Sequence, residues 1–247
     1  MPRVDRLTTL MERFSLTVRP AVDGSASLVV TGAEGTAGGA FHFRTRPGSF
    51  AVPPGDVLFA ADVTWGGLSN PLFAALPEVV EFEISDDDDR DLARLIASEL
   101  RAERCGSGSV VNRLCEVLVV RMLRRLIEAG STEPGLLAGL SDPRLSRAIV
   151  AIHDHPDRQW QSDDLANIAG MSLSRFSEVF TRTVGQPPMS YLRQWRLTLA
   201  RQDVARGERI QTIARRYGYG STEGFARAFR GQFGENPVKL RPRAAVS

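Results

Sequence analysis

The chain of 247 residues has little of what marks secreted, membrane or metal-binding proteins. Its 2 cysteines and 3 histidines cannot form a disulfide framework or a four-ligand zinc site. No apolar run approaches the roughly 20 residues that a membrane span needs. The first residues, MPRVDRLTTLMERF, lack the apolar middle of a signal peptide. We therefore expect a cytoplasmic protein without a membrane partner.

Lysine is almost absent, because Lys239 is the only one and arginine supplies the other positive charges. The formal net charge of +2 hides a difference between the halves. Residues 1–140 carry 14 Lys and Arg against 19 Asp and Glu, whereas residues 141–247 carry 17 against 10. A basic half is expected to meet a polyanion. The length allows two domains that each bury a core.

The stretch 14–84 is predicted to form antiparallel strands, after a short helix within residues 1–13. Its short segments are rich in Val, Phe and Thr and alternate with Gly and Pro. The segments are LTV, SLVVTG, AFHFRT, SFAVPPGDVLFA and VTWGGLS. The Pro-Pro-Gly-Asp turn at 53–56 resembles a turn of cupin-type β-sandwiches. The sheet is expected to end near Ile84.

Metal chemistry finds little support in this region. A catalytic cupin holds its metal with several His and a Glu, and here His42 stands alone, so we interpret it as an ordinary strand residue and predict no metal and no cofactor. The acidic run 86–89 lacks the spaced glycine and final glutamate of a calcium loop. We predict a solvated linker whose last aspartates cap the next helix. Trp65 and the apolar strands permit a small-molecule pocket.

Two amphipathic helices are predicted next, at 90–104 and 109–129. The second is so apolar that it must bury more than one stripe. It either packs against the sheet and the first helix or forms part of a dimer seam, and the sequence leaves both readings open. Cys105 and Cys115 could sense oxidation if they are exposed, although buried cysteine is the commoner case.

The stretch 131–143 has the composition of an interdomain linker. A helix capped by Ser141 or Asp142 is predicted to follow, with Pro143 at its first position. His153 and His155 come where this helix ends and are interpreted as capping or surface residues.

The most informative feature is a motif that occurs twice in the basic half. Each copy has an apolar-Ala dipeptide, a glycine four or five residues later, then Ser and two Phe a helical turn apart. Ile213, Ala214, Gly218, Ser221, Phe225 and Phe229 match Leu165, Ala166, Gly170, Ser172, Phe176 and Phe180. This is the pattern of a helix-turn-helix. Its Phe residues are expected in the core, and two copies predict a tandem DNA reader.

A long helix at 187–207 is predicted to join the two copies. Two readers can contact one face of DNA only if they are separated by about one helical turn, roughly 34 Å. A rigid link between them therefore suits the expected function.

Residues 160–241 resemble the DNA-binding domain of the AraC/XylS transcription regulators. The motifs are SxxxFxxxFxxxxGxxPxxYLxxWRLxxA from Ser172 to Ala200 and IAxxxGYGSxxxFxRAFxxxFGxxP from Ile213 to Pro237, closed by Leu240-Arg241. Residues 1–135 resemble the cupin-type sensor domain of one AraC subgroup. The resemblance implies base contacts by the residues Ser174, Ser177, Glu178, Thr222, Glu223, Ala226 and Arg227.

Phosphate contacts are expected from Arg175, Arg182 and Arg230. Arg227 could donate two bonds to guanine or contact a phosphate, and the sequence leaves both open. Glu178 could accept from cytosine but also repels phosphate, so the first reader is expected to be the weaker one. Arg196 matches an arginine usual in the linker helix of the family, and we expect it to pair with a carboxylate.

Together these features predict an α+β protein of two domains. Residues 1–135 would form a cupin-like antiparallel β-sandwich with flanking helices, and residues 136–247 an all-α double helix-turn-helix domain. The predicted function is a sequence-specific transcription regulator that binds double-stranded promoter DNA. Its first domain would sense a small molecule or, without any ligand, mediate dimerisation through 109–129. RNA polymerase is a partner if the protein activates transcription. The alternative is a cupin-type enzyme fused to a DNA-binding module.

Overall fold

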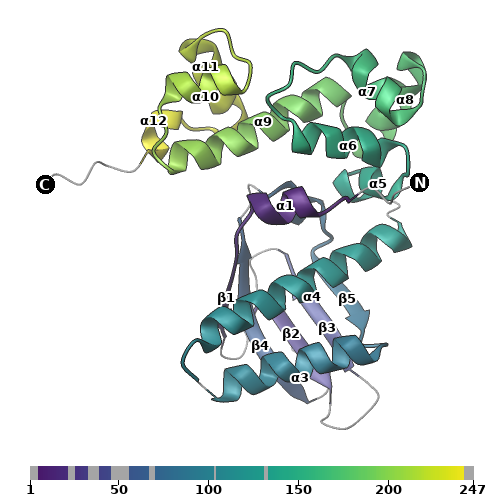
Figure 1. The fold of residues 1–247 in the computed structure, drawn as a ribbon, viewed down its shortest axis with the longest axis vertical. Coiled ribbons are helices and arrows are strands. Elements are labelled where there is room, and N and C mark those ends of the chain that lie inside the picture. Colours follow the sequence, from purple (N-terminus) through teal and green to yellow (C-terminus); the bar gives the residue numbers. More distant parts are fainter. Residues whose placement is uncertain are drawn as a thin grey trace, which may run out of the picture. The chain divides into compact units, whose positions relative to one another are not determined.

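The computed structural model describes residues 5–21, 26–32, 39–45, 56–66, 70–102, 104–130 and 133–241. The chain divides into two compact units (Figure 1). One is Phe14–Ser131, and the other combines Met1–Arg13 with Thr132–Ser247. The domain ranges 1–135 and 136–247 stay predictions. Across the described ranges, every helix is too short or too polar to cross a lipid bilayer.

The unit Phe14–Ser131 is built on an antiparallel sheet, as the sequence predicts. Its described strands are β1 (Leu16–Pro20), β2 (Leu28–Gly32), β3 (Gly39–Arg44), β4 (Val57–Trp65) and β5 (Val79–Glu83), in the spatial order β1-β4-β2-β3-β5. Along β4, buried Phe59, Ala61 and Val63 alternate with more exposed neighbours, the period of 2 of a strand with one covered face. Residues 53–55 of the expected turn lie outside the described ranges.

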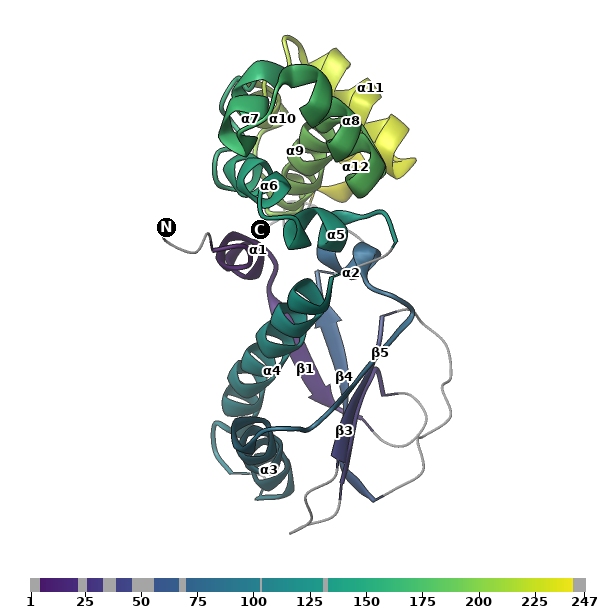
Figure 2. The same cartoon turned by 90° about the vertical axis from the view of Figure 1, so that its right-hand side faces the viewer.

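Helices α3 (Asp87–Ala102) and α4 (Ser107–Ala129) cover one face of this sheet (Figure 2). A short helix, α2 (Pro71–Ala75), precedes β5. On the covered face the Phe41 and Phe82 rings lie 4.8 Å apart, and the Arg125 guanidinium of α4 lies 5.1 Å from the centre of the Phe82 ring. The two predicted helices are confirmed, and α4 packs on the sheet and on α3. The dimer seam on this helix stays a prediction.

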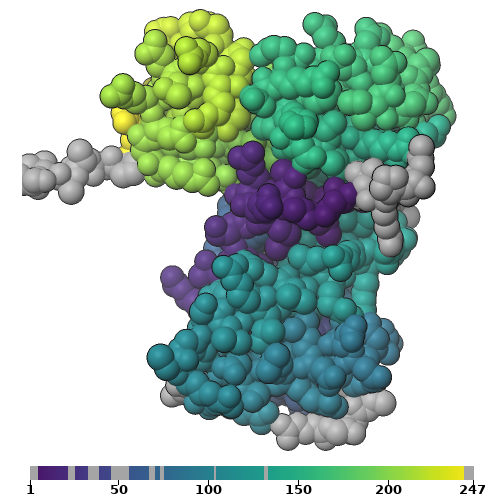
Figure 3. Space-filling view, in the orientation of Figure 1, coloured from purple at the N-terminus to yellow at the C-terminus, as the bar shows by residue number. Residues whose placement is uncertain are grey.

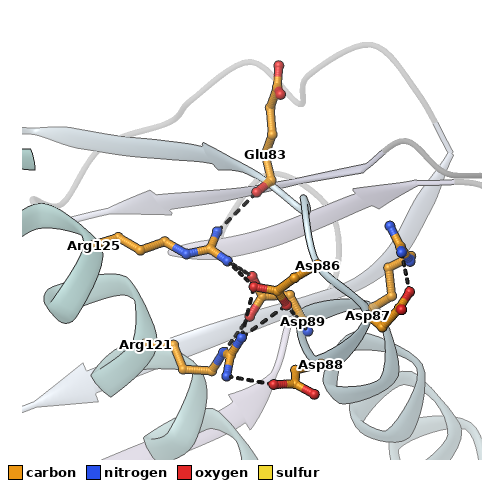
Figure 4. A network of polar contacts seen from close by, with 8 residues as sticks. Glu83, Asp86, Asp87, Asp88, Asp89, Arg121 and Arg125 are labelled. Carbon is orange, nitrogen blue, oxygen red and sulfur yellow. Dashed lines mark hydrogen bonds and ion pairs between the residues drawn. The ribbon is translucent and has the colours of Figure 1, made fainter. Parts of the chain in front are cut away.

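The acidic run 86–89 is not the solvated linker that the sequence predicts. Asp89 is completely buried and pairs with both Arg121 and Arg125 of α4 (Figure 4). Asp86 contacts the same two arginines, with Oδ1 3.0 Å from Arg121 Nη2 and Oδ2 2.8 Å from Arg125 Nη2. The aspartate that caps α3 is Asp86, the first of the run rather than one of the last, because its Oδ1 accepts from the Asp89 backbone N–H at 2.8 Å. Two arginines one helical turn apart on α4 therefore hold the start of α3.

Three residues of this unit that the sequence singled out, Trp65, His42 and Cys115, are buried. Trp65, which with the apolar strands permitted a small-molecule pocket, lies in the core and donates from Nε1 to the Phe14 carbonyl at 2.8 Å. His42 is a buried strand residue, as expected, with Nε2 3.3 Å from Thr31 Oγ1. Cys115 is buried, and burial raises the pKa of its thiol to about 12, which makes it a poor redox sensor. Cys105 is exposed.

The other unit is helical wherever it is regular and described. It contains α1 (Thr8–Arg13), α5 (Leu136–Ser141), α6 (Leu145–Asp154), α7 (Ser162–Ala169), α8 (Leu173–Val184), α9 (Pro188–Ala205), α10 (Ile210–Arg216), α11 (Thr222–Phe233) and α12 (Pro237–Leu240). The predicted repeat is confirmed as the pairs α7–α8 and α10–α11, and α9 joins them. In both turns a glycine takes the left-handed conformation, Gly170 with φ 67° and Gly218 with φ 79°, where other residues are strained.

The segment predicted as an interdomain linker contains α5, and its residues 136–140 are all buried. The apolar run LLAGL fills the space against α6 and α8, so burial of its leucines outweighs the Gly and Pro content that indicated a linker. The following helix begins later than predicted, and Asp142 caps it, because its Oδ1 accepts from the N–H groups of Arg144 at 2.7 Å and Leu145 at 3.0 Å.

The sequence suggested that His153 is a capping or surface residue, and this is wrong. His153 lies in the core of the helical unit. Its Nε2 lies 2.6 Å from the Tyr191 hydroxyl, and its ring centre lies 4.2 Å from that of Trp195. Burial lowers the pKa of His153 to about 3. The imidazole is therefore a neutral packing group between α6 and α9. His155 is exposed, as expected.

Candidate nucleic-acid interface

The first candidate recognition helix, α8, is divided into a buried and an exposed side. Phe176, Val179, Phe180 and Val184 are buried, and the Phe176 and Phe180 rings lie 5.4 Å apart. The residues predicted to face DNA point away from this core: Ser174, Arg175, Glu178 and Arg182 are exposed, and Ser177 is half-buried. The helix is thus fixed through one side, while a polar side stays free for the major groove.

The charged residues of α8 are paired with one another. Glu178 Oε2 lies 3.1 Å from Arg175 Nη1, and its Oε1 lies 3.5 Å from Arg182 Nη1. The three side chains follow the i, i+3 and i+4 spacing that brings neighbours together on a helix surface. The structure therefore brings a predicted base-contacting acid and two predicted phosphate-contacting arginines into one group.

The second candidate recognition helix, α11, has the same division. Phe225 and Phe229 are buried, and their rings lie 5.6 Å apart. Ser221 caps the helix, since its Oγ accepts from the Gly224 backbone N–H at 3.0 Å. The candidate DNA residues are on the other side: Glu223, Arg227 and Arg230 are exposed, and Thr222 and Ala226 are half-buried.

Glu223 lies one helical turn before Arg227. Hydrogen bonds from its own backbone and from the Thr222 hydroxyl lower the pKa of Glu223, and the charge of Arg227 adds to this. The carboxylate is thus ionised at neutral pH, at the helix N-terminus that the dipole favours for anions. This arrangement places one acid and one exposed guanidinium side by side on the face predicted to read DNA.

A buried carboxylate holds the second reader on α9. Asp203 of α9 is buried, and its Oδ2 accepts from the Tyr217 hydroxyl at 2.8 Å and pairs with Arg216 Nη1 at 2.7 Å. Arg216 Nη2 also lies 2.8 Å from Glu208 Oε2. Charge-assisted bonds of this kind are directional, so they fix α10 and the turn that precedes α11. Sequence reasoning missed Asp203, although an acid on the apolar face of a predicted helix was a usable signal.

Arg196 is structural, but it does not pair with the expected carboxylate. Its Nε donates to the Pro156 carbonyl at 2.6 Å, and its Nη2 donates to the Arg158 carbonyl at 2.7 Å. Carbonyls of an irregular segment cannot be anticipated from residue types, since every residue carries one. Arg196 thereby ties the loop between α6 and α7 to α9.

Comparison with known families agrees with this arrangement. A family described as "Helix-turn-helix domain" matches residues 165–243, which include α8 and α11. A family described as "Cupin" matches residues 12–128, which include the sheet, α3 and most of α4. The helix-turn-helix match thus lies in the helical unit, and the cupin match coincides closely with the unit that contains the sheet.

Relatives match most of the length of this chain. A putative AraC-like transcription regulator of Streptomyces antibioticus is 31% identical over 215 residues, which cover 83% of this chain and 70% of the relative. The chain belongs to the AraC-like transcription regulators. An uncharacterised HTH-type transcriptional regulator of Haemophilus influenzae is 30% identical over 176 residues, which cover 71% of this chain and 59% of the relative. Of that relative's length, the chain thus spans about three fifths.

Among solved structures, a transcriptional regulator of Chromobacterium violaceum described as an AraC-type DNA-binding domain-containing protein is 27% identical. The match covers 43% of this chain and 97% of that structure, with a TM-score of 0.40.

Proposed function

We propose that the protein is a cytoplasmic, sequence-specific transcription regulator that binds double-stranded promoter DNA through two readers, α8 and α11. The observation that carries the proposal is the repeated helix-turn-helix, in which each second helix is anchored by buried phenylalanines and presents polar residues outward. An α-helix presented in this way fits the major groove. The excess of basic residues in 141–247 suits a polyanionic partner.

The exposed and half-buried polar-side positions of the two helices are assigned roles in DNA binding. We assign base contacts to Ser174, Ser177, Glu178, Thr222, Glu223, Ala226 and Arg227. We assign phosphate contacts to Arg175, Arg182 and Arg230. Arg227 is the strongest single reader, because a guanidinium can donate two bonds to the acceptor edge of guanine.

The unit Phe14–Ser131 receives the signal in this proposal, either as a small molecule or as a change in self-association. A regulator with an activating role would also contact RNA polymerase. The alternative of a cupin enzyme gains no support from the residues that the structure describes, where no group of three or more His, Cys, Asp or Glu is arranged to hold a metal. Elemental analysis that found stoichiometric iron, manganese or zinc in the purified protein would favour the enzyme.

Self-association is proposed through the outer side of α3 and α4, the helices that form most of the visible surface of their unit in Figure 3. Val110 and Val117 lie two helical turns apart on α4 and are both exposed, and Leu95 of α3 is exposed as well. Large apolar side chains that recur at this spacing on a helix are suited to packing against a second helix. These residues support the proposed homodimer through 109–129.

The proposed function is tested by selecting duplexes from a random pool with the full chain and with Arg227→Ala. We expect a motif with two boxes about one helical turn apart, roughly 34 Å. Arg227→Ala should relax the base preference of one box and cost about 1–3 kcal/mol of binding free energy on the selected site. Uniform weakening with an unchanged motif would make Arg227 a phosphate anchor.

The matched control is Arg144→Ala, which removes an exposed arginine from the same unit but lies outside both recognition helices. It should leave the selected motif unchanged. The proposed function itself fails if the full chain prefers no sequence over random duplex at physiological salt concentration.

A further inference from the structure

The acid of the first recognition helix is surrounded by its own counter-charges. Glu178 pairs with Arg175 one turn before it and with Arg182 one turn after it, at 3.1 Å and 3.5 Å. We call these three residues the α8 triad. Each of the three side chains is more than half exposed, on the side of α8 that carries no core residue.

The ion pairs of the α8 triad add little to the stability of the folded protein. Exposed ion pairs on a helix surface contribute little to folding, typically a few tenths of a kcal/mol. The folding of α8 rests instead on its four buried apolar residues. The triad therefore has its main consequence on the surface that α8 presents to a partner.

A lone glutamate on that surface would oppose DNA binding, since each phosphate repels it. The two guanidinium groups offset this repulsion, because the α8 triad as a whole carries one net positive charge. They also engage only part of the carboxylate, which has about four acceptor positions, so it can accept another donor. In the major groove the exocyclic amine of cytosine is the donor that a carboxylate reads.

We propose, on the basis of the proposed function, that the α8 triad is a cytosine reader, in which Arg175 and Arg182 neutralise and orient Glu178 so that its carboxylate accepts from a cytosine amine. Each arginine has five N–H donors, so both keep donors for the phosphates on either side of the groove. Glu178 is the specificity-determining residue of the first reader, and the two arginines are positioning residues.

The first test is the base preference of the full chain carrying Glu178→Gln, measured by the same selection from random duplexes. A glutamine reads adenine through two bonds. We therefore expect one position of the first box to change from cytosine to adenine, with discrimination of roughly tenfold in each protein. The second box should be unchanged. An unchanged first box would overturn the proposal.

The second test is a double-mutant cycle between Arg175→Ala and Glu178→Gln, with dissociation constants measured on a duplex that carries the preferred base of each protein. If Arg175 serves Glu178, its loss exposes an unneutralised acid to the phosphates. Arg175→Ala should then weaken binding roughly tenfold when Glu178 is present, and at least about threefold less in the Glu178→Gln background. Equal weakening in both backgrounds would make Arg175 a phosphate contact alone and would overturn its positioning role.

The control is Glu78→Gln, which removes an exposed glutamate from the segment between α2 and β5, outside both recognition helices and the proposed dimer surface, and makes the same change in net charge. It should leave the base preference of both boxes and the dissociation constant on each duplex as in the wild type. Failure of the proposed function is distinct, because no protein of the set would then select a motif. A wild-type motif that lacks cytosine in its first box would leave the function intact and overturn the cytosine reader.

Discussion

At the scale of single residues, the His153 imidazole is buried beside the aromatic rings of Tyr191 and Trp195. Phe176, Phe180, Phe225 and Phe229 are apolar residues at helical spacing, and all are buried as predicted. His153 lies four residues after Ile149, on the same apolar stripe, yet its position at the end of the helix led to a capping or surface assignment. The deciding contact is the Tyr191 hydroxyl, 38 residues away, which no local pattern contains.

His153 makes the stability of the helical unit depend on pH. The folded chain keeps this imidazole neutral down to a pKa of about 3, whereas the unfolded value is 6.5. The unfolded chain therefore takes up a proton first, and stability is complete above pH 6.5 and falls as the pH drops from 6.5 toward 3. The slope is about 1.4 kcal/mol per pH unit.

We predict that His153→Gln, which keeps a hydrogen-bonding group for Tyr191 but does not titrate, flattens this dependence. Between pH 7 and pH 5 the variant should lose about 2 kcal/mol less of its free energy of unfolding than the wild type. Urea unfolding of the full chain, followed by circular dichroism at both pH values, measures this difference. His155→Gln is the control, because His155 is exposed and should keep the wild-type slope. An equally steep slope in His153→Gln would refute the assignment.

At the scale of elements, helices and strands were predictable and their long-range partners were not. The spacing of apolar residues along the sequence predicted α3, α4, both helix-turn-helix pairs and the end of the sheet. Four consecutive aspartates are typical of a solvated linker, and the arginines that bury Asp89 come 32 and 36 residues later. Arg121 and Arg125 stand one turn apart on α4, which also carries Arg113 and Arg124. That spacing was the available signal, but an acidic partner could not be chosen from sequence alone.

We predict that Asp89→Asn destabilises the α3–α4 pair by about 2–3 kcal/mol, because it leaves two guanidinium groups without their buried counter-charge. Both arginines are partly exposed, so the cost stays below that of a fully buried broken pair. Asp88→Asn, at the exposed edge of the same cluster, should cost less than about 0.5 kcal/mol. Hydrogen exchange measured by mass spectrometry on peptides from α3, α4 and α8 separates these effects. Faster exchange in α8 alone would contradict the prediction.

At the scale of the whole molecule, the division of charge and the internal repeat were enough to predict the class of protein. Both signals lie in the sequence itself, because a basic half and a twofold motif need no tertiary contacts to be seen. The proposed self-association could not be predicted in this way, since it depends on which side of α4 the sheet leaves exposed. The sequence could count the apolar residues of that helix, but only the structure separates the buried ones from Val110 and Val117.

We predict that Val117→Asp weakens self-association of the full chain at least roughly tenfold, because the dimer would bury an unpaired carboxylate. Val117 is 50% exposed, so the substitution should leave the folded monomer and its DNA motif unchanged. Val79→Asp is the matched control, since Val79 is also an exposed valine of this unit, at 37%, but lies on β5. Sedimentation velocity over a range of protein concentrations measures the dissociation constants. If Val79→Asp weakens the dimer and Val117→Asp does not, the seam lies at the sheet, and a monomeric wild type excludes the homodimer altogether.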